Sequence, residues 1–363
     1  MNRTELLFDR PNTLAATAPP EARGIARDGV RLMVSTSQGH QHAHFLDIAE
    51  YLNPGDLLVV NESATLPASL PAKGSGGEFL LNLSTDYGHQ LWLTEPRWST
   101  SMPGNARPEG AHPEGEVALQ LHFPVREGEV IEVAGLPARV VIPYPGLPRL
   151  WFVQFEGDVH AAMKRFGHPI VYGYIENPPG LDFYQTIFAT TPGSAEMPSA
   201  ARPFTRRVLD SLEARGVQIA PILLHTGVSS LEVETEVVEN HPVYPEPFWV
   251  PGPTARAVNT ARAEGRRVIA IGTTVVRALE SAWDEQAQKV RSVSGFTRLY
   301  VHPQRGVRVI DGLLTGMHDP VTSHLAMLYA IAGQGLIQEA YQEALREGYL
   351  WHEFGDSHLI SKQ

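Results

Sequence analysis

The chain has 363 residues, of which 43% are hydrophobic and 19% charged, a composition typical of a globular protein with room for about two domains. It contains no cysteine, which excludes disulfides, thiolate metal ligands and a cysteine nucleophile, and its net charge of −11 argues against broad, non-specific nucleic-acid binding. No apolar run approaches the roughly eighteen residues of a membrane-spanning helix and no signal pattern opens the chain, so we expect a cytoplasmic protein without a membrane partner.

The first 64 residues predict two strands separated by a short helix. Residues 30–35 form an apolar run typical of a strand, and residues 45–52 have the spacing of a short amphipathic helix. Residues 57–60 then form a continuous apolar run, which is typical of a buried strand. This run ends at Asn61 and Glu62.

Residues 65–155 differ from their surroundings because they contain short alternating apolar runs and no convincing helical pattern. Gly- and Pro-rich turns separate the runs, which lie at residues 79–83, 90–93, 117–123, 130–133, 138–142 and 150–155. Short strands of this kind predict a small antiparallel β domain in the form of a barrel. Residues 100–115 are low in apolar content and predict a long loop.

From about residue 159 onward, helical and strand patterns alternate. We expect strands at residues 217–225, 268–271, 296–301 and 307–313, and helices at residues 205–215, 253–264, 323–332 and 336–347. Alternating units predict an α/β fold with a mixed or parallel sheet and flanking helices. The barrel is then an insertion, so we expect a discontinuous main domain at residues 1–64 and 156–363 and an inserted domain at residues 65–155.

The most informative stretch is RRVIAIGTTVVRALESAW at residues 266–283. A β-branched run stops at Gly272, Thr273 and Thr274 follow, and apolar residues then recur at helix spacing. This pattern predicts a strand, a tight turn and a helix whose first N–H groups are available to a carboxylate or phosphate. The alternative is that Thr273 or Thr274 simply caps the helix.

Three other predicted strands also end in small, hydroxyl-bearing or titratable residues. Because parallel sheets bind ligands at the carboxyl ends of their strands, these residues are candidates for a binding site. They are Asn61, Glu62 and Ser63 after one strand, His225, Thr226, Gly227, Ser229 and Ser230 after the next, and Thr315, Gly316, His318 and Asp319 after the last.

Each titratable candidate has a structural alternative. His225 directly follows a buried strand, so it is either a base or orienting group, or a core histidine bonded to backbone. His318 has Asp319 beside it and is a candidate base, whereas Asp319 can instead cap a helix near Ser323. For Glu62 the alternative is a structural hydrogen bond to a loop.

Common catalytic and metal motifs are absent. The sequence has no GxSxG, no Walker loop and no complete GxGxxG, which removes the usual support for a hydrolase, a P-loop nucleotidase or a dinucleotide oxidoreductase. The histidines lack a clean ligand spacing, so we expect no metal site. Two arginine clusters are either local basic patches or ordinary solvated surface: Arg202, Arg206 and Arg207, and Arg298, Arg305 and Arg308.

A family resemblance is carried by six segments in chain order: LNPGDLLVVNESATLPASL, YQTIFATTPGSAEMPSAARPFT, LLHTGVSSL, IAIGTTVVRALESA, GLLTGMHDPVTSHLAML and EFGDSHLI. The first is similar to LNPGDLLVLNDTRVIPARL, the fifth to ALLTNFHLPRSTLLML and the last to SYGDAMLI. These are segments of the S-adenosylmethionine:tRNA ribosyltransferase-isomerase family of queuosine biosynthesis, and IAIGTTVVRALESA is nearly that family's consensus. The chain is identified as a divergent member.

The resemblance implies an α/β domain with an inserted β-barrel, which agrees with the pattern described above. It also implies transfer and isomerisation of the ribosyl group of S-adenosylmethionine onto a 7-aminomethyl-7-deazaguanine base in tRNA. The products are epoxyqueuosine in tRNA, adenine and methionine. S-adenosylmethionine is then a substrate, and no cofactor is expected. The site must supply a general base and shelter the sulfonium and a carbanion-like centre from water.

The resemblance and the strand ends together give a set of expected site residues. We expect catalytic roles for His318, His225 and Glu62, and His318 as the base whose replacement by alanine abolishes turnover. The N–H groups at residues 272–274 are expected to anchor the methionine carboxylate. The expected substrate-binding residues are Asn61, Ser199, Thr226, Gly227, Gly272, Thr273, Thr274, Arg277 and Thr315.

Several polar positions of the family's site differ in this chain. The family's NDTR reads NESA at residues 61–64, and its PTAGLHFT reads PSAARPFT, with Arg202 and Pro203 in place of Leu and His. TNFHLP becomes TGMHDP, which keeps His318 but places Gly316 where the family has Asn. Lost Arg and His side chains and the acidic charge weaken the case for a tRNA acceptor. The alternatives are a paralogue that uses S-adenosylmethionine with a small-molecule acceptor, or a non-catalytic nucleoside-binding relative. The sequence does not indicate an oligomeric state.

Overall fold

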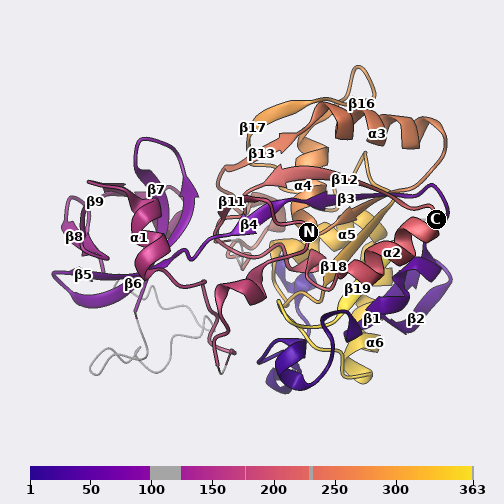
Figure 1. Ribbon diagram of the computed structural model, residues 1–363, viewed down its shortest axis with the longest axis horizontal. Coiled ribbons are helices and arrows are strands. Elements are labelled where there is room, and N and C mark those ends of the chain that lie inside the picture. The colour runs from indigo at the N-terminus through magenta and orange to yellow at the C-terminus, as the bar shows by residue number, and fades with distance from the viewer. Residues whose placement is uncertain (99–123, 176, 229–231, 362–363) are drawn as a thin grey trace. The chain divides into compact units, whose positions relative to one another are not determined.

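The computed structural model describes residues 1–98, 124–175, 177–228 and 232–361 (Figure 1). Contacts divide the chain into two compact units, the first at residues 1–64, 171–193 and 197–363 and the second at residues 65–170 and 194–196. The strand expected at residues 117–123, the loop at 100–115, and Ser229 and Ser230 lie outside the described residues.

The first unit is built on a nine-stranded mixed sheet, which confirms the predicted α/β class (Figure 1). Four neighbouring strands, β12, β3, β14 and β18, are parallel. The sheet continues through antiparallel pairs on both sides, except that β19 and β1 are parallel to each other. The sheet order is β17 (Val293–Thr297), β13 (Glu246–Val250), β12 (Gln218–Leu224), β3 (Leu57–Asn61), β14 (Val268–Ile271), β18 (Gly312–Gly316), β19 (Ser357–Ser361), β1 (Arg31–Thr36) and β2 (Gly39–His44).

Helices cover both faces of this sheet because alternate strand residues point in opposite directions. On one face, Val59 and Ala270 share a core with α3 (Gly252–Ala263), α4 (Thr273–Ser281), α5 (Ser323–Ala332) and α6 (Gln334–Arg346). On the other face, Leu58 and Ile271 share a core with the 3-10 helix η5 (Phe45–Tyr51) and α2 (Arg206–Ala214). The continuous apolar runs of β3 and β14 follow from this burial on both faces.

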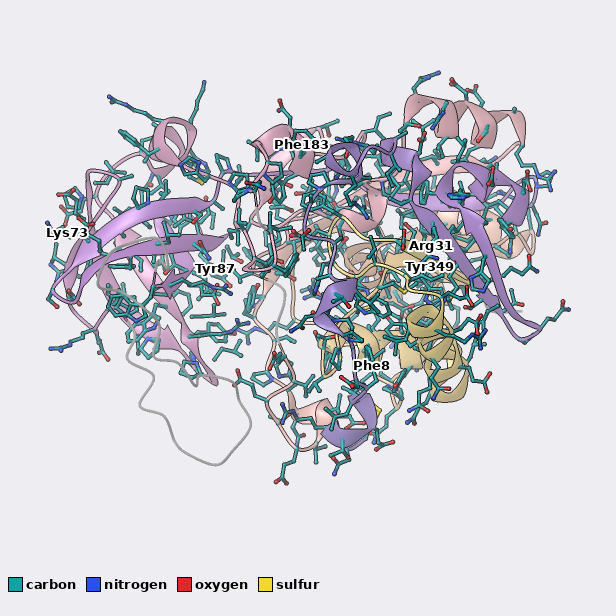
Figure 2. All side chains as sticks on the ribbon, turned by 90° about the horizontal axis from the view of Figure 1, so that it is seen from below. Phe8, Arg31, Lys73, Tyr87, Phe183 and Tyr349 are labelled. Atoms are coloured by element: carbon teal, nitrogen blue, oxygen red, sulfur yellow. The ribbon has the colours of Figure 1, made fainter. Side chains whose placement is uncertain are left out.

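Side chains from distant parts of the chain pack against the last helix and its C-terminal end. Figure 2 labels Arg31 and Tyr349 close together, and the Arg31 guanidinium carbon lies 3.9 Å from the centre of the Tyr349 ring. Phe8 lies edge-on to Tyr341 of α6, with 5.4 Å between ring centres. The N-terminal segment is thereby fixed to the same layer of helices as the C-terminal part of the chain.

The second unit is a closed antiparallel barrel, which confirms that part of the predicted fold (Figure 1). It also holds the helix α1 (Val159–Phe166), whose N-terminus is capped by the Asp158 carboxylate at 3.0 Å from the N of Ala161. The barrel order is β10 (Leu147–Phe155), β7 (Leu91–Arg97), β6 (Gly77–Asp86), β5 (Ser69–Gly74), β8 (Val130–Val133) and β9 (Leu136–Tyr144). The division into separately folding domains at residues 65 and 155 stays a prediction.

Short elements complete the described chain. They are the strands β4 (Ser63–Thr65), β11 (Thr191–Ser194), β15 (Trp283–Asp284) and β16 (Lys289–Val290), and the 3-10 helices η1 (Arg3–Leu6), η2 (Asn12–Leu14), η3 (Pro20–Arg23), η4 (Arg27–Gly29), η6 (Leu181–Tyr184), η7 (Ser199–Ala201) and η8 (Val238–Asn240). Within the described ranges, no helix has both the length and the apolar character needed to cross a bilayer.

The predicted boundaries of two strands are wrong, because side chains of α4 form hydrogen bonds with backbone groups that would otherwise pair within the sheet. β17 ends at Thr297, where the sequence predicted a strand through residue 301, because Arg277 donates to the carbonyls of Thr297 and Leu299. β18 begins only at Gly312, because the N–H groups of residues 308 and 309 donate to the Glu280 carboxylate.

Candidate functional site at the carboxyl ends of the parallel strands

The parallel register brings the predicted strand ends to one edge of the sheet. Ile222 of β12 pairs with Asn61 of β3, and Ile271 of β14 pairs with Leu314 of β18. The segments that follow these residues therefore leave the sheet side by side, as the sequence predicted for adjacent parallel strands.

Asn61 ties three of these ends together. It is fully buried, and its Nδ2 donates to the carbonyl of Leu224 at 2.8 Å and to Thr274 Oγ1 at 3.3 Å. Its Oδ1 accepts from the backbone N–H of Leu224 and of Ser63, both at 3.1 Å. The side chain satisfies polar groups of β12, α4 and its own loop at once, so its role here is to fix the geometry of the edge.

His225 follows β12 and contacts a hydroxyl from the end of β3. Its Nδ1 lies 2.8 Å from Ser63 Oγ, and its backbone N–H donates to the Pro247 carbonyl at 3.0 Å. Burial alone lowers the pKa of the His225 imidazole, since no neighbouring charge contributes. The ring is therefore neutral near pH 7 and able to accept a proton without opposition from a nearby cation.

The helix α4 begins at Thr273, directly after Gly272, and no side chain caps it. The capping alternative for Thr273 and Thr274 is wrong, because Thr274 Oγ1 instead accepts from Asn61. Gly272 has φ of +94°, a conformation that other residues rarely adopt. Among the described residues no acceptor is recorded for the N–H groups of Thr273 and Thr274, so both remain available at the positive end of the helix.

Arg277, one turn further along α4, is held in a buried ion pair. Its Nη1 donates to Glu246 Oε2, while Glu246 Oε1 accepts from the N–H of Gly227 at 2.7 Å. Glu246 is only 2% exposed. The pair therefore joins α4 to the loop after β12 and holds the backbone next to His225 and Thr226.

His318 makes a similar hydroxyl contact at the end of β18. Its Nε2 lies 2.7 Å from Thr315 Oγ1, and its backbone N–H donates to Tyr341 Oη at 3.1 Å. Its carbonyl accepts from the Trp351 indole N–H at 3.0 Å. The residue is anchored through both backbone groups and through its ring.

Other imidazoles surround His318. Its ring centre lies 4.7 Å from that of His324, and burial together with His324, His358 and His352 holds its pKa well below the usual value. Burial also lowers the pKa of His324 and of His352 to about 4. Asp319 does not cap α5, where Thr322 does, and its carboxylate lies against His352 instead, with Nδ1 and Oδ2 3.3 Å apart.

The remaining predicted site residues occupy the same edge with different exposure. Glu62 is half-buried, and its backbone carbonyl accepts from the N–H groups of residues 190 and 191. Thr226 is buried. Ser199 lies in η7 and lines a hollow together with Gly316 and His352. Gly272 lies close to η7, since a Cβ on Gly272 would be 3.4 Å from the Ala200 Cβ.

The two arginine clusters are largely neutralised by carboxylates. Arg202 is 2% exposed and pairs with Glu21 at 2.9 Å, and Arg207 pairs with Asp28. The other pairs are Arg206 with Asp210, Arg305 with Glu280 and Arg308 with Glu285. These contacts do not support a phosphate-binding patch at either cluster. In the described part of the chain, no group of three or more His, Asp or Glu side chains is placed to hold a metal ion.

Sequence reasoning missed Gly193, Glu246 and His352. Gly193 lies in the PGSAEM segment, where its contact with His225 depends on the folding of a distant loop. Glu246 is separated from Arg277 by 31 residues, so no local spacing links them. The one sequence signal that could have pointed to Gly193 is the family resemblance, because the Pro-Gly pair is part of a matching segment.

Comparison with known proteins gives a consistent result over the whole chain. The family described as queuosine biosynthesis protein matches residues 3–360. S-adenosylmethionine:tRNA ribosyltransferase-isomerases from Thermus thermophilus and Moorella thermoacetica are 37% and 36% identical, over 94% and 99% of this chain and 96% and 100% of the relatives. The crystal structure of S-adenosylmethionine tRNA ribosyltransferase from Thermotoga maritima is 26% identical, with a TM-score of 0.52, and covers 98% of this chain and 99% of that one.

Proposed function

The chain belongs to the queuosine biosynthesis protein family, and on this premise we propose that it is an S-adenosylmethionine:tRNA ribosyltransferase-isomerase. It transfers and isomerises the ribosyl group of S-adenosylmethionine onto a 7-aminomethyl-7-deazaguanine base in tRNA, and adenine and methionine are released. The observation that carries the proposal is the meeting of His225, Ser63 and the uncapped start of α4 at one edge of the parallel sheet.

The start of α4 suits the methionine carboxylate of the substrate. The N–H groups of Thr273 and Thr274 have no recorded acceptor among the described residues, and the helix dipole favours a negative group at this end. Asn61 holds Thr274 against β3, so the donors are positioned before the ligand binds. S-adenosylmethionine is a substrate in this reaction.

The reaction requires a base close to the ribose. The sulfonium makes the protons on the neighbouring 5′ carbon acidic, and removal of one of them starts ring opening and loss of adenine. The aminomethyl nitrogen of the acceptor then attacks the ribosyl fragment. A general base works best when its pKa lies near the pH of the reaction.

Between the two candidate bases, the surroundings favour His225. Burial lowers the pKa of both imidazoles, but it holds the pKa of His318 well below the usual value. Taking up a proton therefore costs more at His318, because burial disfavours the charged form of its imidazole. His318 then serves to shape the ligand-facing end of β18 together with Thr315.

The acceptor has two candidate classes. The relatives' names include tRNA, and on that basis tRNA is the first candidate. A free small-molecule acceptor is the second, because Arg202 and Arg207 are engaged by Glu21 and Asp28 and the net charge is −11. Phosphate contacts need cationic side chains that are not already neutralised.

The test is to incubate the purified protein with S-adenosylmethionine and measure adenine and methionine, with and without tRNA that carries the aminomethyl-deazaguanine base. Release that depends on this tRNA is the expected result. Release with the free base alone supports the small-molecule acceptor. If calorimetry shows no binding of S-adenosylmethionine, both reaction proposals fail and a non-catalytic role remains.

A further inference from the structure

The imidazole of His225 lies between two small residues from different segments, Ser63 and Gly193. We propose that Ser63 is a positioning residue, which accepts the hydrogen bond from His225 Nδ1–H and so keeps Nε2 unprotonated as the basic nitrogen. Gly193 provides the space in which the ring lies. The catalytic role of His225 in this inference rests on the proposed function. Which nitrogen of His225 carries the proton can be measured without it.

The contact with Ser63 is enclosed and rigid. Ser63 is fully buried, so bulk water does not compete for its hydroxyl. Its backbone N–H donates to Asn61 Oδ1 at 3.1 Å, which fixes the start of β4 relative to β3. With the backbone fixed, the 2.8 Å separation between Ser63 Oγ and His225 Nδ1 is set by the fold.

Gly193 determines where the ring can lie. A Cβ on this residue would be 2.3 Å from Cε1, 2.4 Å from Nδ1 and 2.5 Å from Nε2 of His225. These three ring atoms therefore rest against the Gly193 backbone, and any side chain would displace the imidazole. φ of Gly193 is not in the left-handed region, so the requirement for glycine comes from this contact alone.

The tautomer follows from the partners of the two ring nitrogens. Because burial lowers its pKa, His225 is neutral near pH 7 and carries one N–H. Among the described residues, Ser63 is the one hydrogen-bond partner recorded for the ring, at Nδ1. Placing the N–H on Nδ1 satisfies it inside the protein and leaves the Nε2 lone pair for a substrate proton.

The structure contains a matched control in the same sheet. Ser35 on β1 is also fully buried, and its Oγ lies 2.8 Å from His40 Nδ1 and 2.7 Å from His358 Nε2. Removing its hydroxyl breaks serine–imidazole contacts of similar length that do not involve His225. If adenine release is slower in Ser63→Ala than in Ser35→Ala, the cause is therefore the contact of Ser63 with His225 and not the loss of a buried hydroxyl in general.

The experiment compares Ser63→Ala, Ser63→Thr and Ser35→Ala by single-turnover adenine release and by ¹⁵N NMR of histidine-labelled protein, with His225 assigned from a His225→Gln variant. We expect Ser63→Ala to slow release about 10- to 100-fold with S-adenosylmethionine affinity unchanged within about threefold. Ser63→Thr restores the rate because it keeps the hydroxyl, as does the family's NDTR. Ser35→Ala leaves the rate unchanged.

The NMR measurement stands apart from activity. The inference is supported, even if no adenine is released, when His225 carries its proton on Nδ1 in the wild type and shows a mixture of tautomers in Ser63→Ala. A proton on Nε2 in the wild type overturns it, as does an unchanged release rate in Ser63→Ala. As a second pair, Gly193→Ala should slow release, whereas Gly180→Ala should not, since a Cβ on Gly180 meets nothing within 4 Å.

Discussion

At two places on the carboxyl edge of the parallel strands, a hydroxyl contacts a histidine ring, but the surroundings of the two rings differ. At the end of β3 and β12, Ser63 Oγ lies 2.8 Å from His225, and at the end of β18, Thr315 Oγ1 lies 2.7 Å from His318. Burial alone lowers the pKa of the first imidazole, while burial is the main cause at the second and three further histidines lie near it. A hydroxyl–imidazole contact therefore does not by itself set basicity, because burial lowers the pKa of both imidazoles and holds that of His318 well below its usual value.

The two ends also differ in how far they depart from the family's segments. The GTT segment after β14 keeps the family pattern, and the segment after β12 keeps His225 and Gly227 with Thr226 in place of Val, whereas Gly316 replaces an Asn after β18. Arg202, which replaces a Leu, is buried against Glu21, with its guanidinium carbon 4.8 Å from the centre of the Phe354 ring. Arg202 is therefore engaged in internal contacts with Glu21 and Phe354.

The largest expected effect is at His225. Replacing it in His225→Gln keeps the size and polarity of the side chain but removes a titratable base. We expect adenine release to fall by about 10²- to 10⁴-fold, the usual contribution of general base catalysis, with S-adenosylmethionine binding retained. Single-turnover kinetics and calorimetry measure the two quantities, and a rate within threefold of wild type would remove His225 from the catalytic site.

The next largest effect concerns the ion pair that supports the His225 end. Glu246→Gln leaves Arg277 without its anionic partner in a buried site, and we expect the free energy of unfolding to fall by about 3–5 kcal/mol. Glu264→Gln is the control, because Glu264 pairs with Arg266 on the surface and is 56% exposed, so its loss should have little effect. Urea denaturation of both variants checks this, and equal losses would contradict it.

A smaller effect is expected at the start of α4. Gly272→Ala places a side chain at φ of +94° and within 3.4 Å of Ala200, so the turn must shift. We expect a loss of about 1–3 kcal/mol in unfolding free energy and weaker S-adenosylmethionine binding, because the N–H groups of Thr273 and Thr274 move with the turn. Gly333→Ala at the start of α6 has φ of +85° and open space, so it should lower stability without changing affinity.

A pH dependence of stability is expected from the buried histidines on the β18 and β19 side. Burial lowers the pKa of His358 to about 3 and of His324 and His352 to about 4. Below the unfolded value of about 6.5, the unfolded state binds more protons, so stability is complete above that pH and falls as the pH drops toward 4. Each group contributes a slope of up to about 1.4 kcal/mol per pH unit.

His358→Met sharpens this prediction, because the family's closing segment has Met at that position and the variant removes one titrating group. We expect the pH dependence of the unfolding free energy between pH 4 and 6 to become shallower by roughly one proton's contribution. Denaturation at a series of pH values measures it. An unchanged slope would show that His358 is not a neutral, buried imidazole.

Much of the fold and part of the site could be predicted from the sequence. The strand–Gly–Thr–Thr–helix pattern and the polar ends of β3 and β12 are local signals, and adjacency of parallel strands brings them together. The family resemblance, which the comparisons confirm, gave the chemistry.

Contacts between distant segments could not be predicted in this way. The bonds from Glu280 to residues 308 and 309 displaced the start of β18, and no periodicity reports such a side-chain acceptor. Gly193 against His225 and Glu246 against Arg277 are likewise products of tertiary packing. The relative basicity of His225 and His318 depends on those surroundings, which no sequence pattern reports, and the choice of His225 over His318 as the base stays a proposal.

The most direct test of this account uses S-adenosylmethionine deuterated at the 5′ carbon. Adenine release from protiated and deuterated substrate is compared in the wild type, His225→Gln and His318→Gln under single-turnover conditions. We expect His318→Gln to remain within about tenfold of the wild type and to keep its isotope effect, while His225→Gln loses release, as expected when the proton acceptor is removed. Retained release with an isotope effect in His225→Gln, together with its loss in His318→Gln, would contradict the account.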